Sequence, residues 1–198
     1  MPTTLVGIAK ALVNAAGRVL AGRGQVAVIA ASDTSQNQME AIRHIETHIA
    51  QEAPGLALVA TTFCEDEQEQ ARTIARDLLA RHPGVKVLIA TCAPAVPGAA
   101  QAVKESGRQD VRVVGMSLPG ACRELIVDGV VDTVVLWSTV DLGFLTVVTA
   151  HAVVKGLLKP GDVCLRAGRL GTVIVKDDQV RLGRPRIYNK GNLESITA

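Results

Sequence analysis

Aromatic residues are scarce in this chain, which has one Trp, one Tyr and two Phe among its 198 residues. Hydrophobic residues nevertheless make up 48% of the sequence, and Ala, Val and Leu dominate them. A core of small aliphatic side chains is typical of α/β domains. The length is that of one domain or of two small ones.

Motifs for catalysis and for metal binding are missing as well. The sequence contains no G-x-S-x-G, no Walker A motif and no G-x-G-x-x-G after a strand. His44 and His48 have a spacing that can hold a metal ion on a helix, but no third ligand follows nearby. We therefore expect a protein without enzymatic activity, without a metal and without a cofactor.

The four cysteines, Cys64, Cys92, Cys122 and Cys164, lie far apart in the sequence and form no C-x-x-C pair. This spacing does not match a zinc site. We expect four free thiols, which fits a reducing compartment slightly better than an oxidising one.

Long hydrophobic runs and a strong net charge are absent too. Residues 142–158 form the most apolar segment, but His151 and Lys155 interrupt it, so we predict a buried helix and no membrane span.

The first four residues do not resemble a signal peptide, which predicts a cytoplasmic protein if the chain is translated as given. The net charge is +2, and we interpret the excess of Lys and Arg in residues 155–190 as a solvated face, with no nucleic acid expected.

Apolar runs and helical periodicities alternate along the first two thirds of the chain. Continuous apolar runs predict buried strands, and the segments between them place apolar residues at helical spacing. This alternation predicts an α/β fold with a doubly wound parallel sheet, in the strand order 2-1-3-4-5. The predicted strands are 25–30, 56–61, 85–90, 111–116 and 133–136, and the predicted helices are 5–20, 38–52, 65–81, 97–106, 121–130 and 140–158.

The pattern changes after residue 158. Two short apolar runs, 172–175 and 179–182, flank Asp177 and Asp178 and predict a small hairpin. We interpret the tail 187–196 as irregular. The acidic run Glu65–Glu69 is best explained as the beginning of the third helix, where negative charge is favourable.

Polar side chains gather where the predicted strands end. In an open doubly wound sheet, ligands bind at the carboxyl ends of the strands, where the strand order reverses. The loops there are 32–38 (SDTSQNQ) and 91–97. The hydroxyl and amide groups of the first loop can bind a polyol, but a helix-capping turn would need the same residue types.

Trp137 and Asp141 lie at the next strand end along this edge. Trp137 is the only tryptophan, and its ring could stack on a sugar or pack in the core. Asp141 could accept a hydrogen bond from a ligand hydroxyl or simply occupy the first turn of the following helix.

The sequence VVGMSLPG, the segment LWSTVDLG, the linker VVKGLLKPGD and the tail IYNKGNLESI occur in this order. Together they resemble type I periplasmic sugar-binding proteins of ABC importers, in particular the rhamnose- and autoinducer-binding branch. The resemblance covers nearly the whole chain and implies that it is the second lobe of that family, with the first lobe missing. Residues 1–137 would then be the sugar-binding lobe, and 138–198 the hinge crossover helix with a C-terminal tail.

The resemblance also implies a set of ligand-binding residues. Ser35 and Gln36 occupy the positions of an Asp-Gln pair that contacts the ligand in the autoinducer-binding branch. Thr91 and Ala93 occupy positions where that branch has a Pro and an Ala, and Ser117 stands where many members have a ligand-binding Asp. Because the acidic partner and the Pro are replaced, the implied ligand is some other small sugar or polyol.

The resemblance further implies an ABC permease as partner and a periplasmic location. An alternative is the effector-binding or interaction domain of a transcriptional repressor, which shares this fold and needs no export. Helix 140–158 is apolar on all sides and must be covered, so we expect a homodimer through it or aggregation.

Overall fold

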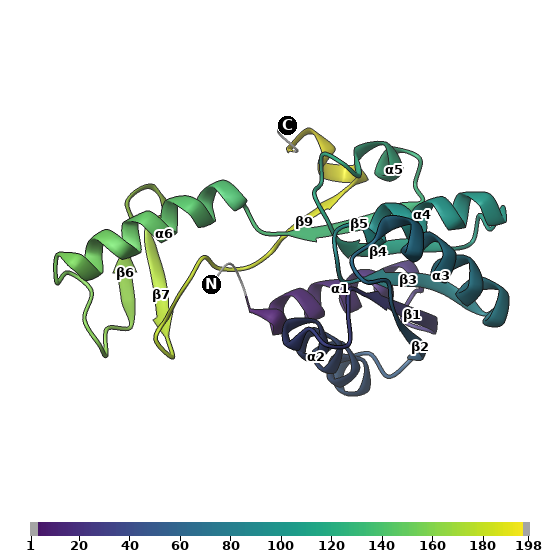
Figure 1. Cartoon of the computed structure of the whole chain (residues 1–198), viewed down its shortest axis with the longest axis horizontal. Helices are drawn as coiled ribbons and strands as arrows, with labels where there is room; N and C mark the ends of the chain where they lie inside the picture. Colours follow the sequence, from purple (N-terminus) through teal and green to yellow (C-terminus); the bar gives the residue numbers. More distant parts are fainter. Residues whose placement is uncertain (1–3, 196–198) are drawn as a thin grey trace.

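The computed structural model describes residues 4–195 and shows two bodies of unequal size (Figure 1). The larger body is an α/β lobe, and the smaller one consists of a long helix packed on a short sheet. The larger body contains α1 (Leu5–Val19), β1 (Gly24–Ala30), α2 (Gln36–Glu52), β2 (Leu56–Phe63), α3 (Gln68–Arg81), β3 (Val85–Ala90), α4 (Ala95–Ser106), β4 (Arg112–Met116), α5 (Arg123–Val127), β5 (Val131–Leu136), β9 (Arg186–Asn189) and η2 (Lys190–Ser195). The smaller body contains α6 (Thr139–Val154), β6 (Cys164–Arg166), η1 (Gly168–Leu170), β7 (Thr172–Lys176) and β8 (Gln179–Arg181).

The sheet of the larger body has the order β2-β1-β3-β4-β5-β9, and its first five strands are parallel. This confirms the predicted doubly wound α/β fold. Val26 and Val28 of β1 face a core formed with α1 and α2, whereas Ala27 and Ile29 face a second core formed with α3 and α4. Because both faces are covered, the central strands are continuously apolar, as the sequence indicated.

The Thr4 hydroxyl accepts a hydrogen bond from the Gly7 N–H at 3.0 Å, so Thr4 caps α1. Close packing of α3 on α4 depends on Gly98, because a Cβ there would lie 2.4 Å from the Gln68 carbonyl oxygen.

Other helix ends differ from the prediction. Glu65 and Asp66 adopt positive φ angles in a tight turn, and α3 begins only at Gln68, so most of the acidic run lies before the helix. Pro119 lies in a turn, and α5 is a single short turn of helix from Arg123 to Val127. Helix α6 ends at Val154, earlier than predicted, and Gly156 then takes a positive φ of 66°.

The tail is more regular than predicted. Residues 186–189 form β9, which pairs antiparallel with β5 and places Tyr188 opposite Val134. The interpretation of the tail as irregular is therefore wrong for these residues, while Ile196 lies outside the described residues. A short polar segment has little periodicity, so its pairing is decided by the free edge of β5.

The smaller body forms around α6. Strands β6, β7 and β8 make an antiparallel sheet, which confirms the predicted hairpin at β7–β8 and adds β6, which no pattern in the sequence predicted. Asp177 and Asp178 form the turn with positive φ angles of 53° and 56°. Two connections, 137–138 and 182–185, join this body to the larger one (Figure 1). The proposed division of the chain after residue 137 stays a prediction, and β9 and η2, which it placed with α6, pack on the larger body.

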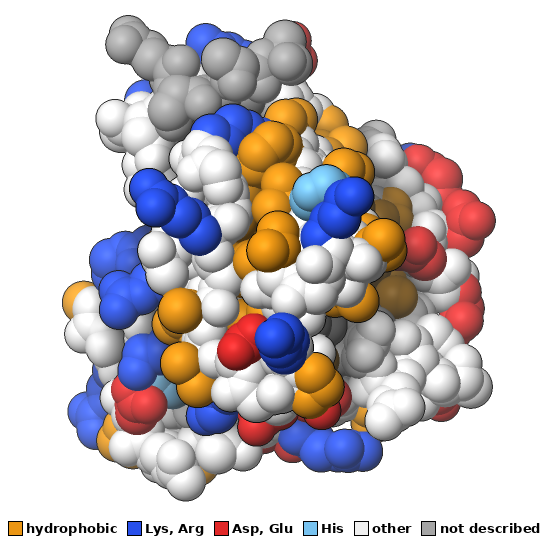
Figure 2. Space-filling model, turned by 90° about the vertical axis from the view of Figure 1, so that its left-hand side faces the viewer, with side chains coloured by type: hydrophobic (Ala, Val, Ile, Leu, Met, Phe, Trp, Pro, Cys, Tyr) orange, Lys and Arg blue, Asp and Glu red, His pale blue; other side chains and the backbone are white. Residues whose placement is uncertain are grey.

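Much of the apolar surface of α6 is exposed. Only Leu145 and Ala152 of this helix are buried, and they pack on Leu165, Ala167 and Val173. Figure 2 views this end of the molecule and shows hydrophobic side chains gathered on it. Exposed large apolar residues of the smaller body include Val140, Val147, Val153, Val154, Leu157, Val163 and Ile174. No helix within residues 4–195 is long and apolar enough to cross a membrane.

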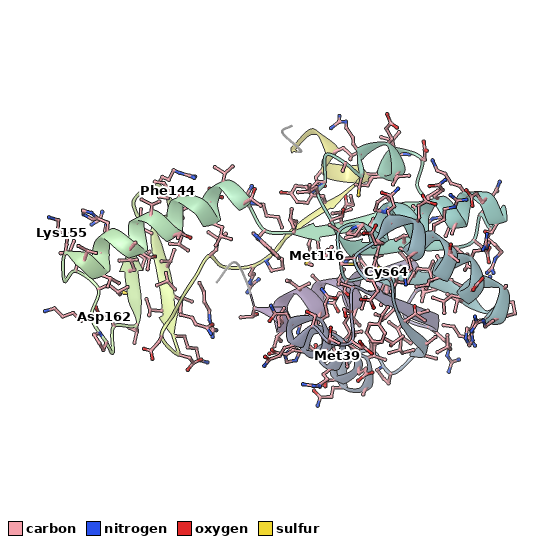
Figure 3. All side chains as sticks on the ribbon, viewed as in Figure 1. Met39, Cys64, Met116, Phe144, Lys155 and Asp162 are labelled. Carbon is pink, nitrogen blue, oxygen red and sulfur yellow. The ribbon has the colours of Figure 1, made fainter. Side chains whose placement is uncertain are left out.

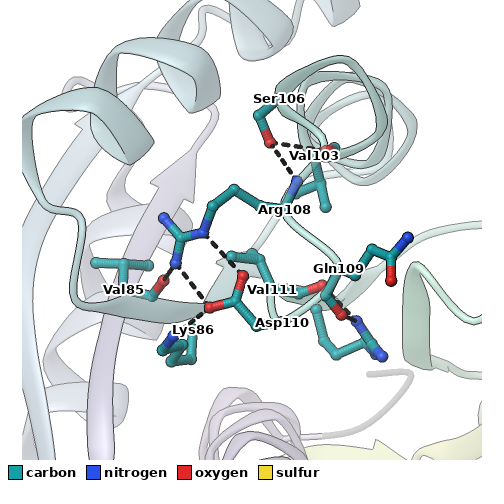
Figure 4. A network of polar contacts seen from close by, with 9 residues as sticks. Val85, Lys86, Val103, Ser106, Arg108, Gln109, Asp110 and Val111 are labelled. Carbon is teal, nitrogen blue, oxygen red and sulfur yellow. Dashed lines mark hydrogen bonds and ion pairs between the residues drawn. The ribbon is translucent and has the colours of Figure 1, made fainter.

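An ion-pair network joins the amino ends of β3 and β4, at the edge opposite the predicted site (Figure 4). The guanidinium of Arg108 donates to both carboxylate oxygens of Asp110, at 2.8 and 3.1 Å, and to the Val85 carbonyl oxygen at 3.0 Å. Lys86 also pairs with Asp110. These contacts hold the pKa of Asp110 well below its usual range, with the Arg108 hydrogen bond as the main cause.

Candidate functional site

A cavity of about 370 Å³ lies at the carboxyl ends of the parallel strands. Helices α1 and α2 form its walls, and the residues that follow β3 and β5 close it. Its lining is mostly apolar: Leu5, Ile8, Ala9, Leu12, Asn37, Gln38, Ala41, Ile45, Thr91, Met116 and Trp137. Met116 marks the edge of the larger body that faces α6 (Figure 3). A depression of about 430 Å³ between Lys104, Arg108 and Asp128 lies at the amino ends of the strands, away from this edge.

Thr91 and Gln38 form the polar centre of the cavity wall. The Thr91 hydroxyl donates to Gln38 Oε1 at 2.6 Å, and Gln38 Nε2 donates to the Thr91 carbonyl oxygen at 3.3 Å. Gln38 Oε1 also accepts from the Ala31 N–H at 3.4 Å. Thr91 is buried. These bonds connect α2 to the ends of β1 and β3, so both side chains are largely occupied in holding the wall together.

The first turn of α2 carries amide groups that are available to a ligand. Gln36 and Asn37 are exposed, and Asn37 contributes to the cavity lining. Within the described residues neither side chain makes a hydrogen bond, and Ser35, the residue preceding the helix, makes no capping bond through its hydroxyl. The sequence analysis selected Ser35 and Gln36, but it missed Asn37 and Gln38 in the same loop.

Trp137 is half-buried and combines the two roles that the sequence left open. Its ring packs against the core beneath α1 and also lines the cavity. Its indole N–H has no hydrogen-bond partner among the described residues. A flat apolar surface with one free donor is therefore presented to the cavity.

Ala93 and Ser117 lie outside the cavity lining. The Ser117 hydroxyl is buried and donates to the Ala93 carbonyl oxygen at 3.0 Å, which connects the loops after β3 and β4. The Ala93 side chain is exposed. A direct ligand contact of either residue stays a prediction, and the structure gives them a role in fixing two strand-end loops.

Asp141 lies in the first turn of α6, and its carboxylate is already paired. Its two oxygens accept from Arg169 at 2.6 Å and from Arg186 at 2.8 Å, and Ser138 caps the same turn by accepting from the Asp141 N–H. The pKa of Asp141 is lowered, mainly by the hydrogen bond from Arg169. Arg169 also stacks over the Phe144 ring at 4.5 Å. The position of Asp141 agrees with the first-turn alternative, and ligand binding by Asp141 stays a prediction.

The apolar part of the cavity could not be assigned from the sequence. Leu5, Ile8 and Leu12 carry the ordinary spacing of a buried helix face, and the wall that they form depends on where α1 crosses the strand ends. Only the packing of α1 over the sheet shows that its first turns border a cavity.

Comparison with known proteins agrees with this architecture. Residues 3–158 match the model of the periplasmic binding protein domain family. This chain belongs to that family. The match includes both cavity helices, every strand end of the site and all of α6.

Solved structures with this fold cover nearly all of the chain. A sugar ABC transporter protein from Actinomyces odontolyticus matches 99% of it, with a TM-score of 0.90 and 24% identity. A solute-binding protein from Clostridium phytofermentas with bound L-rhamnose matches 98%, with a TM-score of 0.82 and 23% identity. LsrB from Clostridium saccharobutylicum, in complex with AI-2, matches 99%, with a TM-score of 0.84 and 22% identity. The chain spans 64%, 66% and 68% of these proteins, respectively.

Proposed function

We propose that this chain binds a small sugar or polyol at the carboxyl edge of its parallel sheet, as the solute-binding component of an ABC importer outside the cytoplasm. The observation that carries the proposal is the combination of the Gln36 and Asn37 amide groups, which make no hydrogen bond within residues 4–195, with the apolar wall of the neighbouring cavity. A sugar ring has hydroxyl groups at its rim and apolar C–H faces, so it matches both surfaces. Membership of the periplasmic binding protein family supports the same function.

The character of the cavity favours sugars with an apolar substituent. Met116 and Ile8 offer neither a donor nor an acceptor to an additional hydroxyl group, so a hydroxymethyl buried against them would lose hydrogen bonds to water without replacement. A methyl group at that position would gain contact instead. L-Rhamnose and L-mannose differ in this one group, and a solved neighbour contains bound L-rhamnose. We therefore propose a 6-deoxy sugar such as L-rhamnose as the ligand.

The emission of Trp137 tests the proposal directly, because it is the only tryptophan and lines the cavity. We expect a saturable change on titration with L-rhamnose and a weaker response to L-mannose. Gln36 and Asn37 offer only a few hydrogen bonds, each of which contributes about 0.5–1.5 kcal/mol. We therefore expect a dissociation constant on the order of 1 mM.

Two substitutions separate binding from an unspecific fluorescence change. Gln36→Ala removes one free amide, and we expect it to abolish the response. Gln109→Ala changes an exposed amide at the opposite edge of the sheet and should leave the titration unchanged. A folded protein that gives no response to any sugar at tens of millimolar contradicts sugar binding, whereas equal loss in both variants shows that the signal does not come from the cavity.

The location and the permease partner need a separate experiment. Fractionation of cells that express the native locus should place the protein outside the cytoplasm, and crosslinking should recover the membrane permease of an importer. Recovery in the cytoplasm together with a DNA-binding partner would support the repressor-type alternative instead.

A further inference from the structure

Two cysteines that are distant in the sequence contact one another in the fold. The sulfur atoms of Cys64 and Cys92 lie 3.6 Å apart, although 28 positions separate the residues. Both side chains are buried, at 0% and 4% exposure. The other two cysteines differ, since Cys122 is buried next to Ser117 and Cys164 is exposed.

The contact arises at the point where three neighbouring strands end. Strand β1 lies between β2 and β3, so the backbones of β2 and β3 are ~10 Å apart, which is too far for a disulfide within the sheet. Cys64 follows the last residue of β2, and its N–H donates to the Ala30 carbonyl oxygen at the end of β1. Cys92 follows β3 by two residues. Both side chains can therefore meet over the end of β1.

The surroundings favour a thiolate at Cys64. The pKa of Cys64 is lowered to about 7, mainly because its thiolate accepts a hydrogen bond from Cys92. Burial acts in the opposite direction, and hydrogen bonds from the backbone N–H groups of Asp66 and Glu67 lower the pKa further. The hydrogen bond between the two cysteines raises the pKa of Cys92. Cys64 precedes α3 and Cys92 precedes α4, so both thiols lie near helix N-termini, where negative charge is favourable.

We propose that Cys64 and Cys92 are a disulfide-forming pair that fastens the ends of β2 and β3 together when the chain folds in the presence of a disulfide donor such as oxidised glutathione. The Cys64 thiolate attacks one sulfur of glutathione disulfide and expels one glutathione thiolate, which leaves a mixed disulfide. The Cys92 sulfur then attacks Sγ of Cys64 and expels the second glutathione thiolate. The two protons lost by the cysteines end on the two glutathione thiols.

Burial determines when this reaction occurs. The folded protein shields both sulfur atoms, so exchange takes place during folding or during opening of the loops before α3 and α4. Once formed, the bond closes a loop of fewer than thirty residues and also fixes the segment that carries Thr91 and Ala93. Loop closure restricts the unfolded chain, and the expected rise in the thermal midpoint is about 10 °C.

The test compares refolding in the presence and in the absence of the disulfide donor. The full chain with Cys122→Ala and Cys164→Ser retains only the proposed pair. After refolding with a mixture of reduced and oxidised glutathione, we expect no thiol that reacts with a maleimide in denaturant and a mass lower by two hydrogen atoms. Peptide mapping should recover a crosslink between Cys64 and Cys92. Dithiothreitol should then lower the thermal midpoint by about 10 °C.

Further variants establish which two sulfur atoms form the bond. Adding Cys64→Ser or, separately, Cys92→Ala to this background should remove both the crosslink and the dithiothreitol effect, and circular dichroism should confirm that each variant folds. In the wild-type chain, Cys122 and Cys164 should still react with an alkylating agent after the pair has formed. Two reactive thiols in the folded double variant after redox refolding, or a crosslink that involves Cys122 or Cys164 in the wild-type chain, would overturn the proposal.

Discussion

The Thr91 hydroxyl donates a hydrogen bond of 2.6 Å to Gln38 Oε1, which joins the end of β3 to the first turn of α2. The two residues are 53 positions apart, and the bond lies in the wall of the candidate sugar site. Gln38 also accepts from the Ala31 N–H after β1. The shape of the cavity thus depends on one side chain that holds three separate strand-end and helix-end segments in place.

Thr91→Val should test the strength of this connection. Removing the donor leaves a partly buried amide oxygen with one weak hydrogen bond, and we expect a loss of about 1–2 kcal/mol in the free energy of unfolding, measured with urea. Thr34→Val changes an exposed hydroxyl of the preceding loop and should alter stability by less than about 0.5 kcal/mol. Similar losses in both variants would contradict a specific role for the Thr91–Gln38 bond.

Alanine at two helical glycines should have opposite effects. At Gly98 a Cβ would lie 2.4 Å from the Gln68 carbonyl oxygen, so Gly98→Ala must separate α3 from α4 and should cost about 1–3 kcal/mol. At Gly143 in α6 nothing lies within 4 Å of the added carbon, and Gly143→Ala should stabilise the protein by roughly 0.5–1 kcal/mol. Thermal unfolding of both variants checks the sign of each effect, and a stabilised Gly98→Ala would show that α3 and α4 can move apart freely.

Acid should weaken the protein partly through Asp110. Its folded-state pKa is depressed, so its contribution is fully present above the unfolded pKa of ~3.9 and is lost as the pH falls toward the folded pKa. Asp110→Asn should be less stable than the wild type at pH 7 and should lose less stability on acidification below about pH 4. Urea midpoints measured across this range check the difference, with the exposed Asp33→Asn as control. Parallel pH profiles of Asp110→Asn and the wild type would show that the Asp110 network does not cause the loss of stability in acid.

The apolar surface of α6 should cause self-association. Val147 and Val154 are 70% and 83% exposed, and contiguous apolar surface of this kind favours a contact with a second copy. We propose a homodimer through α6, and Val147→Glu with Val154→Glu should shift sedimentation toward monomer at micromolar concentration. Lys155→Glu changes a charge next to the same surface without removing apolar area, and it should have little effect. A wild-type chain that sediments as a monomer would contradict the proposal.

Local patterns in the sequence predicted the five parallel strands, the burial of the central ones and most of the helices correctly. A continuous apolar run such as 85–90 requires cover on both faces wherever it lies. Parallel strands joined by helices have one dominant handedness, so the alternation of elements also indicated the sheet. These features depend on short stretches of chain, which is why the sequence was sufficient for them.

Other features depended on contacts between distant residues. Cys64 with Cys92, Asp141 with Arg186, and β9 on the edge of β5 each join segments whose sequences contain no sign of the partner. Trp137 and the loop 32–38 were selected because strand ends carry ligands in this architecture, and Trp137, Asn37 and Gln38 line the cavity, whereas the apolar wall from α1 was not expected. Periodicity predicts which face of a helix is buried. What a side chain faces across a cavity is decided by how whole helices and strands pack. The free energy of that packing is spread over the entire core, so no short stretch of sequence reveals it.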